Sequence, residues 1–92
     1  MRFRFTNAKS EALRRNPKRG IGFEEAQEIF ERPYYQDQRS DDLLQYRAIE
    51  WVDDRMFTLI FEIREDRFDE YYHLVTLWRS TREERELYEA NS

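Results

Sequence analysis

Seven side chains that suit phosphate chemistry lie on, or directly after, the strands that the sequence predicts. Two are arginines on successive strands and the rest belong to the last strand and its end: Arg47, Arg64, His73, Thr76, Arg79, Ser80 and Thr81. Cleavage of an RNA phosphodiester needs removal of the 2′-hydroxyl proton, positive charge at the transition state, and a proton for the leaving oxygen. Arginine binds phosphate oxygens through its planar fork, and histidine titrates near neutral pH. These residues form a candidate catalytic set.

The same residues also have structural explanations. An arginine on an exposed sheet face commonly pairs with an acid across the strands, and Glu50 and Glu62 are available for this. Thr81-x-x-Glu84 is a capping box that opens a helix, and Ser80-x-x-Glu83 offers the adjacent register. Exposed rings at Tyr71 or Tyr72 would suit stacking on an unpaired base.

The charge of the chain is unevenly distributed. Residues 1–20 hold seven Lys or Arg against a single acid, whereas residues 21–92 hold nine Arg against nineteen acids. The basic segment formed by Arg14, Arg15, Lys18 and Arg19 is a candidate for contacts with an RNA backbone, because phosphate contacts dominate nucleic-acid affinity. Alternatively, this segment neutralises the acidic faces of the rest of the chain.

Several classes of site are excluded by composition and spacing. There is no cysteine, which removes disulfides and thiolate chemistry, and a lone His73 cannot supply the usual zinc spacings. Gly20-Ile21-Gly22 lacks the Lys-Ser/Thr of a phosphate-binding loop. We therefore expect no metal and no cofactor. No apolar run approaches a membrane span and the N-terminus lacks a signal-peptide core, so we expect a cytoplasmic protein that does not contact membranes.

The apolar pattern predicts alternating helices and strands. Residues 1–5 alternate as a strand, residues 7–16 suit a short helix with Asn7 as N-cap, and the two glycines mark a turn. Residues 23–32 carry an amphipathic helical stripe stopped by Pro33. Residues 36–42 are polar and are predicted to be a loop. Strands are expected at 43–52, 55–64 and 71–78, with Phe57, Leu59, Phe61 and Ile63 on one face, before a helix that follows Thr81.

These elements predict a single α+β domain over residues 1–92. Short turns between the three central strands favour an antiparallel meander. The expected architecture is one antiparallel sheet of about four strands with two N-terminal helices and a C-terminal helix.

The order of motifs resembles the BrnT family of type II toxins over residues 5–89. The segments that carry the resemblance are "RGIGFEEAQEIFERP", "YRAIEWVDDRMFTLIFEIR" and "HLVTLWRSTREERELYE". The resemblance implies a RelE-like fold and metal-independent endoribonuclease activity. It also implies a BrnA-like antitoxin partner of the ribbon-helix-helix type, through which alone the complex would bind DNA. Arg47 and Arg64 match the strand arginines of the family, and Thr81, Glu84, Arg85 and Tyr88 match its C-terminal motif.

The chain departs from the family pattern at three places. Lys18-Arg19-Gly20 stands where the family has Lys-His-Gly, and His73 stands where its last strand opens with arginine. Thr76-Leu77-Trp78 replaces Ser-Ala-Arg, which moves the nearest arginine to Arg79. A shift of one residue reverses the face of a strand, so Arg79 replaces the lost arginine only if the strand has ended or bulged there. Trp78 instead offers a surface on which an RNA base can stack.

Three functional hypotheses follow. In the first, the protein cleaves RNA: Arg64 and Arg47 hold the phosphate, His73 or Arg79 assists, and Thr76 positions the substrate. In the second, the substitutions have removed cleavage and the protein only binds its antitoxin. In the third, it is an unrelated small interaction domain.

Overall fold

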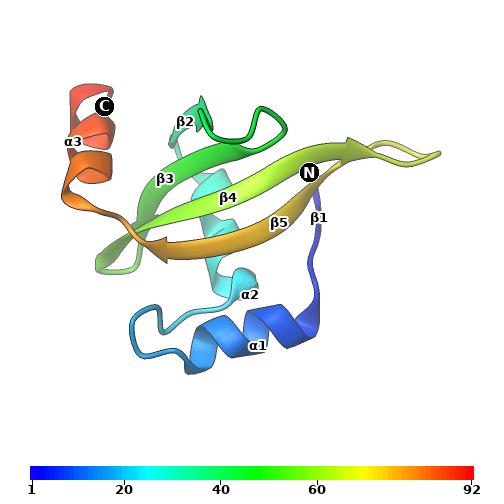
Figure 1. The fold of residues 1–92 in the computed structure, drawn as a ribbon, viewed down its shortest axis with the longest axis horizontal. Coiled ribbons are helices and arrows are strands. Elements are labelled where there is room, and N and C mark those ends of the chain that lie inside the picture. Colours follow the sequence, from blue (N-terminus) through cyan, green and yellow to red (C-terminus); the bar gives the residue numbers. More distant parts are fainter.

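The sheet has five strands and is mixed. In the computed structural model, which describes residues 1–92, the strands lie in the order β1-β5-β4-β3-β2 (Figure 1). Their bounds are β1 Arg2–Arg4, β2 Tyr35–Gln38, β3 Tyr46–Val52, β4 Arg55–Glu65 and β5 Glu70–Arg79. Neighbouring strands run antiparallel, except that β1 lies parallel to β5. The predicted α+β class is confirmed, but the sheet has one strand more than expected and is mostly rather than wholly antiparallel.

The additional strand is β2, whose residues 36–38 belong to the segment predicted to be a loop. Its residues are polar and do not alternate with apolar ones, so the sequence gives no strand pattern. Backbone pairing with β3 builds the strand, in a register that sets Asp37 opposite Arg47. Because β2 is an edge strand, polar side chains on it can remain solvated.

The helices lie on both sides of the sheet. Helix α1 (Asn7–Arg15) and α2 (Phe23–Ala26), which continues as the 3₁₀ helix η1 (Gln27–Glu31), cover one face, and α3 (Arg82–Ala90) lies on the other side (Figure 1). The expected helices are thus confirmed, but Asn7 is not the N-cap. Thr6 has extended backbone angles and its hydroxyl accepts a 3.3 Å hydrogen bond from the Lys9 N–H, so Thr6 caps α1. None of the helices is both long and apolar enough to span a membrane.

The turn between α1 and α2 requires its two glycines for different reasons. Gly20 has φ +79°, in the left-handed region that glycine adopts without strain. A Cβ on Gly22 would lie 2.4 Å from the Ser10 hydroxyl oxygen, so only glycine permits this close approach. Ser10 is buried there, and its hydroxyl accepts a 2.9 Å hydrogen bond from the Phe23 N–H.

The core lies between the sheet and the N-terminal helices. Leu13, Phe23, Ala26 and Ile29 pack against the inner side chains of the sheet, which are Ala48, Val52, Phe57, Leu59, Phe61, Leu74 and Leu77. The predicted apolar stripe of residues 23–30 and the shared face of Phe57, Leu59 and Phe61 are therefore confirmed. Ile63, at the distal end of β4, remains 39% exposed.

A β-bulge at Val75 changes the alternation of β5. Ile60 pairs with Thr76 and Phe61 pairs with Leu74, which leaves Val75 without a partner on β4. Leu74 and Leu77 consequently both face the core although they are three residues apart. Paired residues of antiparallel strands point to the same side, so the residues opposite Glu62, Ile60 and Thr58 share the other face. These residues are His73, Thr76 and Trp78.

The turn between β4 and β5 is joined to β1 through Asp66. Its carboxylate accepts hydrogen bonds of 3.1 and 3.0 Å from the Arg2 guanidinium, and further ones from Arg4 and from the N–H groups of Phe68 and Asp69. The hydrogen bond from Arg2 is the largest of the contributions that hold the pKa of Asp66 well below its usual range. This contact favours the ionised carboxylate in the folded protein.

We expect Asp66 to make stability depend on pH in the acid range. Because its pKa is lower in the folded than in the unfolded chain, its contribution is fully present above the unfolded pKa of about 4 and is lost as the pH falls below that value. Urea unfolding should therefore show a smaller difference between wild type and Asp66→Asn at about pH 3 than at about pH 7. An equal difference at both pH values would contradict this role.

Candidate functional site

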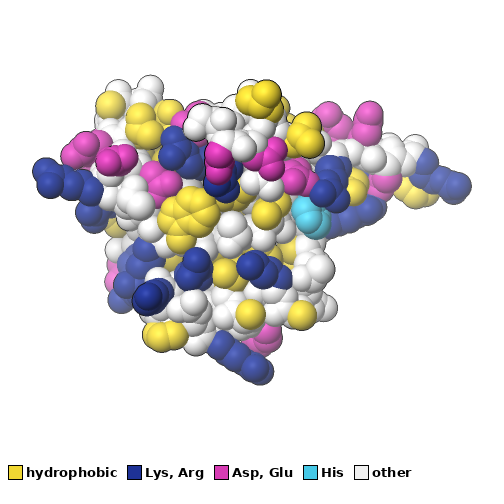
Figure 2. Space-filling model, in the orientation of Figure 1, with side chains coloured by type: hydrophobic (Ala, Val, Ile, Leu, Met, Phe, Trp, Pro, Cys, Tyr) yellow, Lys and Arg dark blue, Asp and Glu magenta, His cyan; other side chains and the backbone are white.

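The sheet face turned away from α1 and η1, which we call the second face, carries five of the predicted site residues. They are Arg47 on β3, Arg64 on β4, and His73, Thr76 and Trp78 on β5. Arg47, Ile60 and Thr76 form one row across the three strands, and Thr58 and Trp78 belong to the next row. Figure 2 shows basic and acidic side chains interleaved over this part of the molecule, with the single histidine at the surface.

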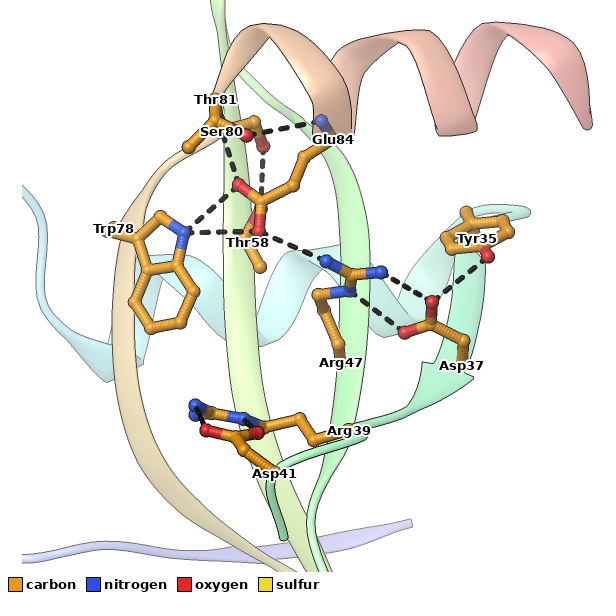
Figure 3. A network of polar contacts seen from close by, with 10 residues as sticks. All are labelled: Tyr35, Asp37, Arg39, Asp41, Arg47, Thr58, Trp78, Ser80, Thr81 and Glu84. Carbon is orange, nitrogen blue, oxygen red and sulfur yellow. Dashed lines mark hydrogen bonds and ion pairs between the residues drawn. The ribbon is translucent and has the colours of Figure 1, made fainter.

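Arg47 is held by carboxylates on two elements. Its Nε donates a 2.9 Å hydrogen bond to Asp37 on β2, Nη2 pairs with the same carboxylate, and Nη1 lies 3.5 Å from Glu84 of α3. The hydrogen bond with Asp37 is the main cause that raises the pKa of Arg47. Tyr35 adds a 3.0 Å hydrogen bond from its hydroxyl to Asp37 (Figure 3). The structural explanation for Arg47 thus holds, with Asp37 in place of Glu50.

Glu84 is the centre of this polar network. Its carboxylate accepts hydrogen bonds of 3.0 and 3.3 Å from Trp78 Nε1 and one of 2.8 Å from the Thr81 N–H, in addition to its contact with Arg47 (Figure 3). The Thr81 hydroxyl accepts from the Glu84 N–H, so the predicted capping box is confirmed. The side chain of Glu84 is only 7% exposed, and its partners balance the cost of burying a charge.

The hydroxyl groups after β5 are occupied by structural contacts. Ser80 Oγ lies 2.9 Å from Thr58 Oγ1, and the Ser80 N–H donates a 3.0 Å hydrogen bond to the Met56 carbonyl. The strand-to-helix junction is therefore fixed to the sheet by Ser80 and to α3 by Thr81. Neither hydroxyl is left as an unoccupied group on the second face.

The far end of the second face is rich in alternating charges. Arg64 Nε donates a 2.9 Å hydrogen bond to Glu62, and this contact is the main cause that raises the pKa of Arg64. His73 lies opposite Glu62 on one side and Arg4 of β1 on the other, and its ring makes no hydrogen bond within the protein. His73 is thus the titratable group among the second-face residues that has no protein hydrogen-bond partner.

The two tyrosines proposed as stacking surfaces are occupied. Arg4 and Arg2 cover the ring of Tyr71, with guanidinium carbons 4.1 and 5.8 Å from its centroid. The ring centroid of Tyr72 lies 4.7 Å from that of Phe61 and 5.0 Å from that of Phe30. Neither ring is therefore free to stack on a base, which corrects that expectation.

Arg79 does not replace the arginine that the family has in the last strand. The bulge lies at Val75, and regular pairing continues to the end of β5, where Arg79 is opposite Phe57. Arg79 and Trp78 consequently point to opposite sides of the sheet. Arg79 is exposed at the strand end, where it lines a hollow with Ser80 and Arg85 and does not share the second face.

The basic segment lies outside the second face, on and after α1. Arg14 is surrounded by Glu11, Glu24 and Glu25, with nitrogen–oxygen distances of 2.6 to 3.1 Å. Arg19 Nε donates a 2.8 Å hydrogen bond to the Leu77 carbonyl. Arg15 and Lys18 are exposed and form no ion pair. The segment is thus partly used for internal neutralisation, and it does not join the second-face residues in one site.

Sequence reasoning missed a cavity of about 260 Å³ next to Trp78. Its walls include Asp37 and Arg39, which come from the segment predicted to be a loop, together with Ile60 and Trp78. The sequence carries no pattern that indicates this cavity, because its walls come together only through the pairing of β2 with β3 and the bulge in β5. No group of three or more His, Cys, Asp or Glu side chains is arranged as a metal site.

No protein-family model matches the chain, and no curated protein matches it.

We expect Glu84 to be the most sensitive position of the network. Glu84→Ala should lower the free energy of unfolding by about 2–4 kcal/mol, because it removes the carboxylate half of the capping box and leaves the part-buried Trp78 indole N–H without a partner. Arg47 would keep only its contact with Asp37. Glu83→Ala, one residue earlier in the same helical turn but exposed, is the matched control and should cost no more than about 0.5 kcal/mol. Equal losses in urea unfolding would show that the network does not hold α3.

Proposed function

We propose that the protein is a bacterial, cytoplasmic ribonuclease toxin of the BrnT type, neutralised by a BrnA-like antitoxin that supplies the DNA-binding part of the complex. The order of motifs along the chain supports the family assignment. The observation that carries the proposal is the second face itself. Arg47, His73, Thr76 and Trp78 reach one side of the sheet from β3 and β5, although the spacing of the last three does not follow strand alternation.

The residues around the bulge suit phosphodiester cleavage. His73 precedes the bulge, Thr76 follows it, and Arg47 lies in the same row as Thr76. A phosphate over this part of the face would meet a group able to exchange protons, a hydroxyl donor and a guanidinium. His73 would take the 2′-hydroxyl proton or protonate the leaving oxygen, and Arg47 would stabilise the charge of the transition state. Arg64, one row beyond His73, would bind the adjacent phosphate.

These roles require RNA to compete with the carboxylates of the face. Arg47 is engaged by Asp37 and Glu84, and Arg64 by Glu62. Arg64 is the easier of the two to release, because its side chain is 50% exposed against 24% for Arg47. An exposed ion pair of this kind contributes little to stability, so phosphate can replace Glu62 at small cost.

The same ion pairs favour a second candidate function. Arg47 and Arg64 are both paired with carboxylates, and the indole N–H of Trp78 is bonded to Glu84. These contacts are what we would expect of a relative that still binds the antitoxin but has lost RNA cleavage. Such a protein would bind its antitoxin tightly and leave RNA intact.

Induction in a bacterial host distinguishes the two functions. Wild type should arrest growth, and His73→Ala and Arg64→Ala should relieve the arrest. Purified His73→Ala should cleave RNA at least about 100-fold more slowly, because a proton-transfer group contributes roughly that factor. Purified Arg64→Ala should also cleave more slowly, because it lacks a guanidinium that binds phosphate. Arg67→Ala, an exposed arginine of the β4–β5 turn without an ion pair, is the matched control and should remain toxic. Cleavage should persist in the presence of a metal chelator.

Two results would overturn this proposal. Undiminished toxicity of folded His73→Ala and Arg64→Ala would show that the second face does not carry the reaction. Unimpeded growth with abundant folded wild type, intact RNA and tight binding of a ribbon-helix-helix partner would establish the binding-only function.

A further inference from the structure

One wall of the cavity on the second face is the indole ring of Trp78, whose orientation is fixed by hydrogen bonds. Trp78 lines the cavity, and both oxygens of Glu84 accept from its Nε1 at 3.0 and 3.3 Å. Glu84 is itself held by the N–H of Thr81. The indole ring therefore cannot rotate without breaking hydrogen bonds to a buried carboxylate. A rigid ring of this kind binds a planar ligand at a small cost in side-chain entropy.

A guanidinium stands on the other side of the cavity. The guanidinium carbon of Arg39 lies 5.9 Å from the centroid of the Trp78 ring. Arg4 lies 4.1 Å from the centroid of the Tyr71 ring, which is the distance of direct contact, so Arg39 is near Trp78 without direct stacking contact. Figure 3 shows the two side chains at the same polar network. A planar ring inserted between the two groups needs about 7 Å, which is two van der Waals contacts of about 3.5 Å. The Arg39 side chain would therefore have to reposition to face the Trp78 ring at this spacing.

Arg39 can make this movement together with its partner. Its Nε donates a 2.8 Å hydrogen bond to Asp41, two residues further along the same β2–β3 loop, and the Asp41 side chain is 65% exposed. The ion pair holds the guanidinium at the wall of the cavity, and the Asp41 side chain makes no further contact with the sheet. The backbone N–H of Arg39 donates a 2.9 Å hydrogen bond to the Gln45 carbonyl, so the backbone stays in place and the paired side chains of Arg39 and Asp41 are the parts that can shift.

The size and the walls of the cavity restrict the ligand. A volume of about 260 Å³ lies just below the range typical of sites for drug-sized molecules, which limits the occupant to a single ring system. Ile60 is the apolar residue beside Trp78, while Asp37 and Arg47 provide acceptors and donors at the wall. A flat ring with polar edges matches such a site, and an aliphatic chain does not.

We propose that this cavity binds one unpaired nucleobase of an RNA strand, stacked between the Trp78 indole and the Arg39 guanidinium. The inference rests on the proposed function for the nature of the ligand, and it adds a base-binding position beside the row of Arg47 and Thr76. Aromatic rings and guanidinium planes are the groups on which splayed-out bases stack. A base held there must leave its helix, so the site selects single-stranded over duplex RNA.

The chain contains two tryptophans, which provide an internal control for binding. In a ¹⁵N-labelled sample, adenosine 5′-monophosphate should shift the indole N–H peak of Trp78 in a saturable manner and leave that of Trp51 unchanged. A Trp51→Phe variant assigns the two peaks. Ribose 5-phosphate, which lacks the base, should shift neither peak. Equal shifts by ribose 5-phosphate, or no shift of the Trp78 peak by the nucleotide, would overturn the proposal.

Substitution of the covering arginine tests the sandwich. Arg39→Ala should weaken binding of adenosine 5′-monophosphate about tenfold, as expected for loss of one stacking partner. Arg67→Ala, an exposed arginine of the distant β4–β5 turn, should bind as wild type does. Unchanged binding by folded Arg39→Ala would refute the role of Arg39. Growth arrest and RNA cleavage are measured separately, so a protein that binds the nucleotide without cleaving RNA would uphold this inference and refute the proposed function.

Discussion

The bulge at Val75 is the constraint on which both faces of the sheet depend. Without an unpaired residue at this position, Leu74 and Leu77 would point to opposite sides, and one of them would leave the core. With it, both leucines remain buried, and His73 and Thr76 share the second face. Bulges commonly redirect side chains near functional sites, and here one inserted residue assembles the candidate site and preserves the core.

The charges of the second face determine what the proposed binding of RNA would require of an acidic protein. The cations of the site are paired with neighbouring carboxylates, as in Arg47 with Asp37 and Arg64 with Glu62. RNA phosphates would replace these carboxylates at the exposed end of the face, where ion pairs are weak, and would find Arg47 already oriented at the buried end. The hydrogen bonds of Glu84 hold both α3 and Trp78 on the second face. The same residues therefore stabilise the fold and line the candidate site.

The sequence was sufficient to predict the main elements of the fold. The apolar stripe from Phe23 to Phe30 gave the second helical segment, the alternation around Phe57 to Phe61 gave the central strand, and Thr81-x-x-Glu84 gave the start of α3. Each of these signals is local. The Thr6 cap was missed because Asn7, an equally good capping residue, stands next to it.

Features that depend on pairing between distant residues were not predictable. β2 has no apolar alternation and is recognisable as a strand only from its pairing with β3. The bulge in β5 is needed for Leu74 and Leu77 to pair with Phe61 and Leu59 of β4, which the local sequence of β5 does not reveal. The position of Arg79 on the opposite face and the cavity between Arg39 and Trp78 follow from these two features. Candidate residues could therefore be named from the sequence, but their grouping into one face could not.

The central claim is that RNA binds to the second face. Mapping of ¹⁵N chemical-shift changes with a 2′-O-methyl oligoribonucleotide, which lacks the attacking 2′-hydroxyl and cannot be cleaved, tests it most directly. We predict that the changes concentrate on Arg47, His73, Thr76 and Trp78. Changes confined to the exposed basic residues Arg15 and Lys18 on and after α1, or no changes at all, would contradict the account.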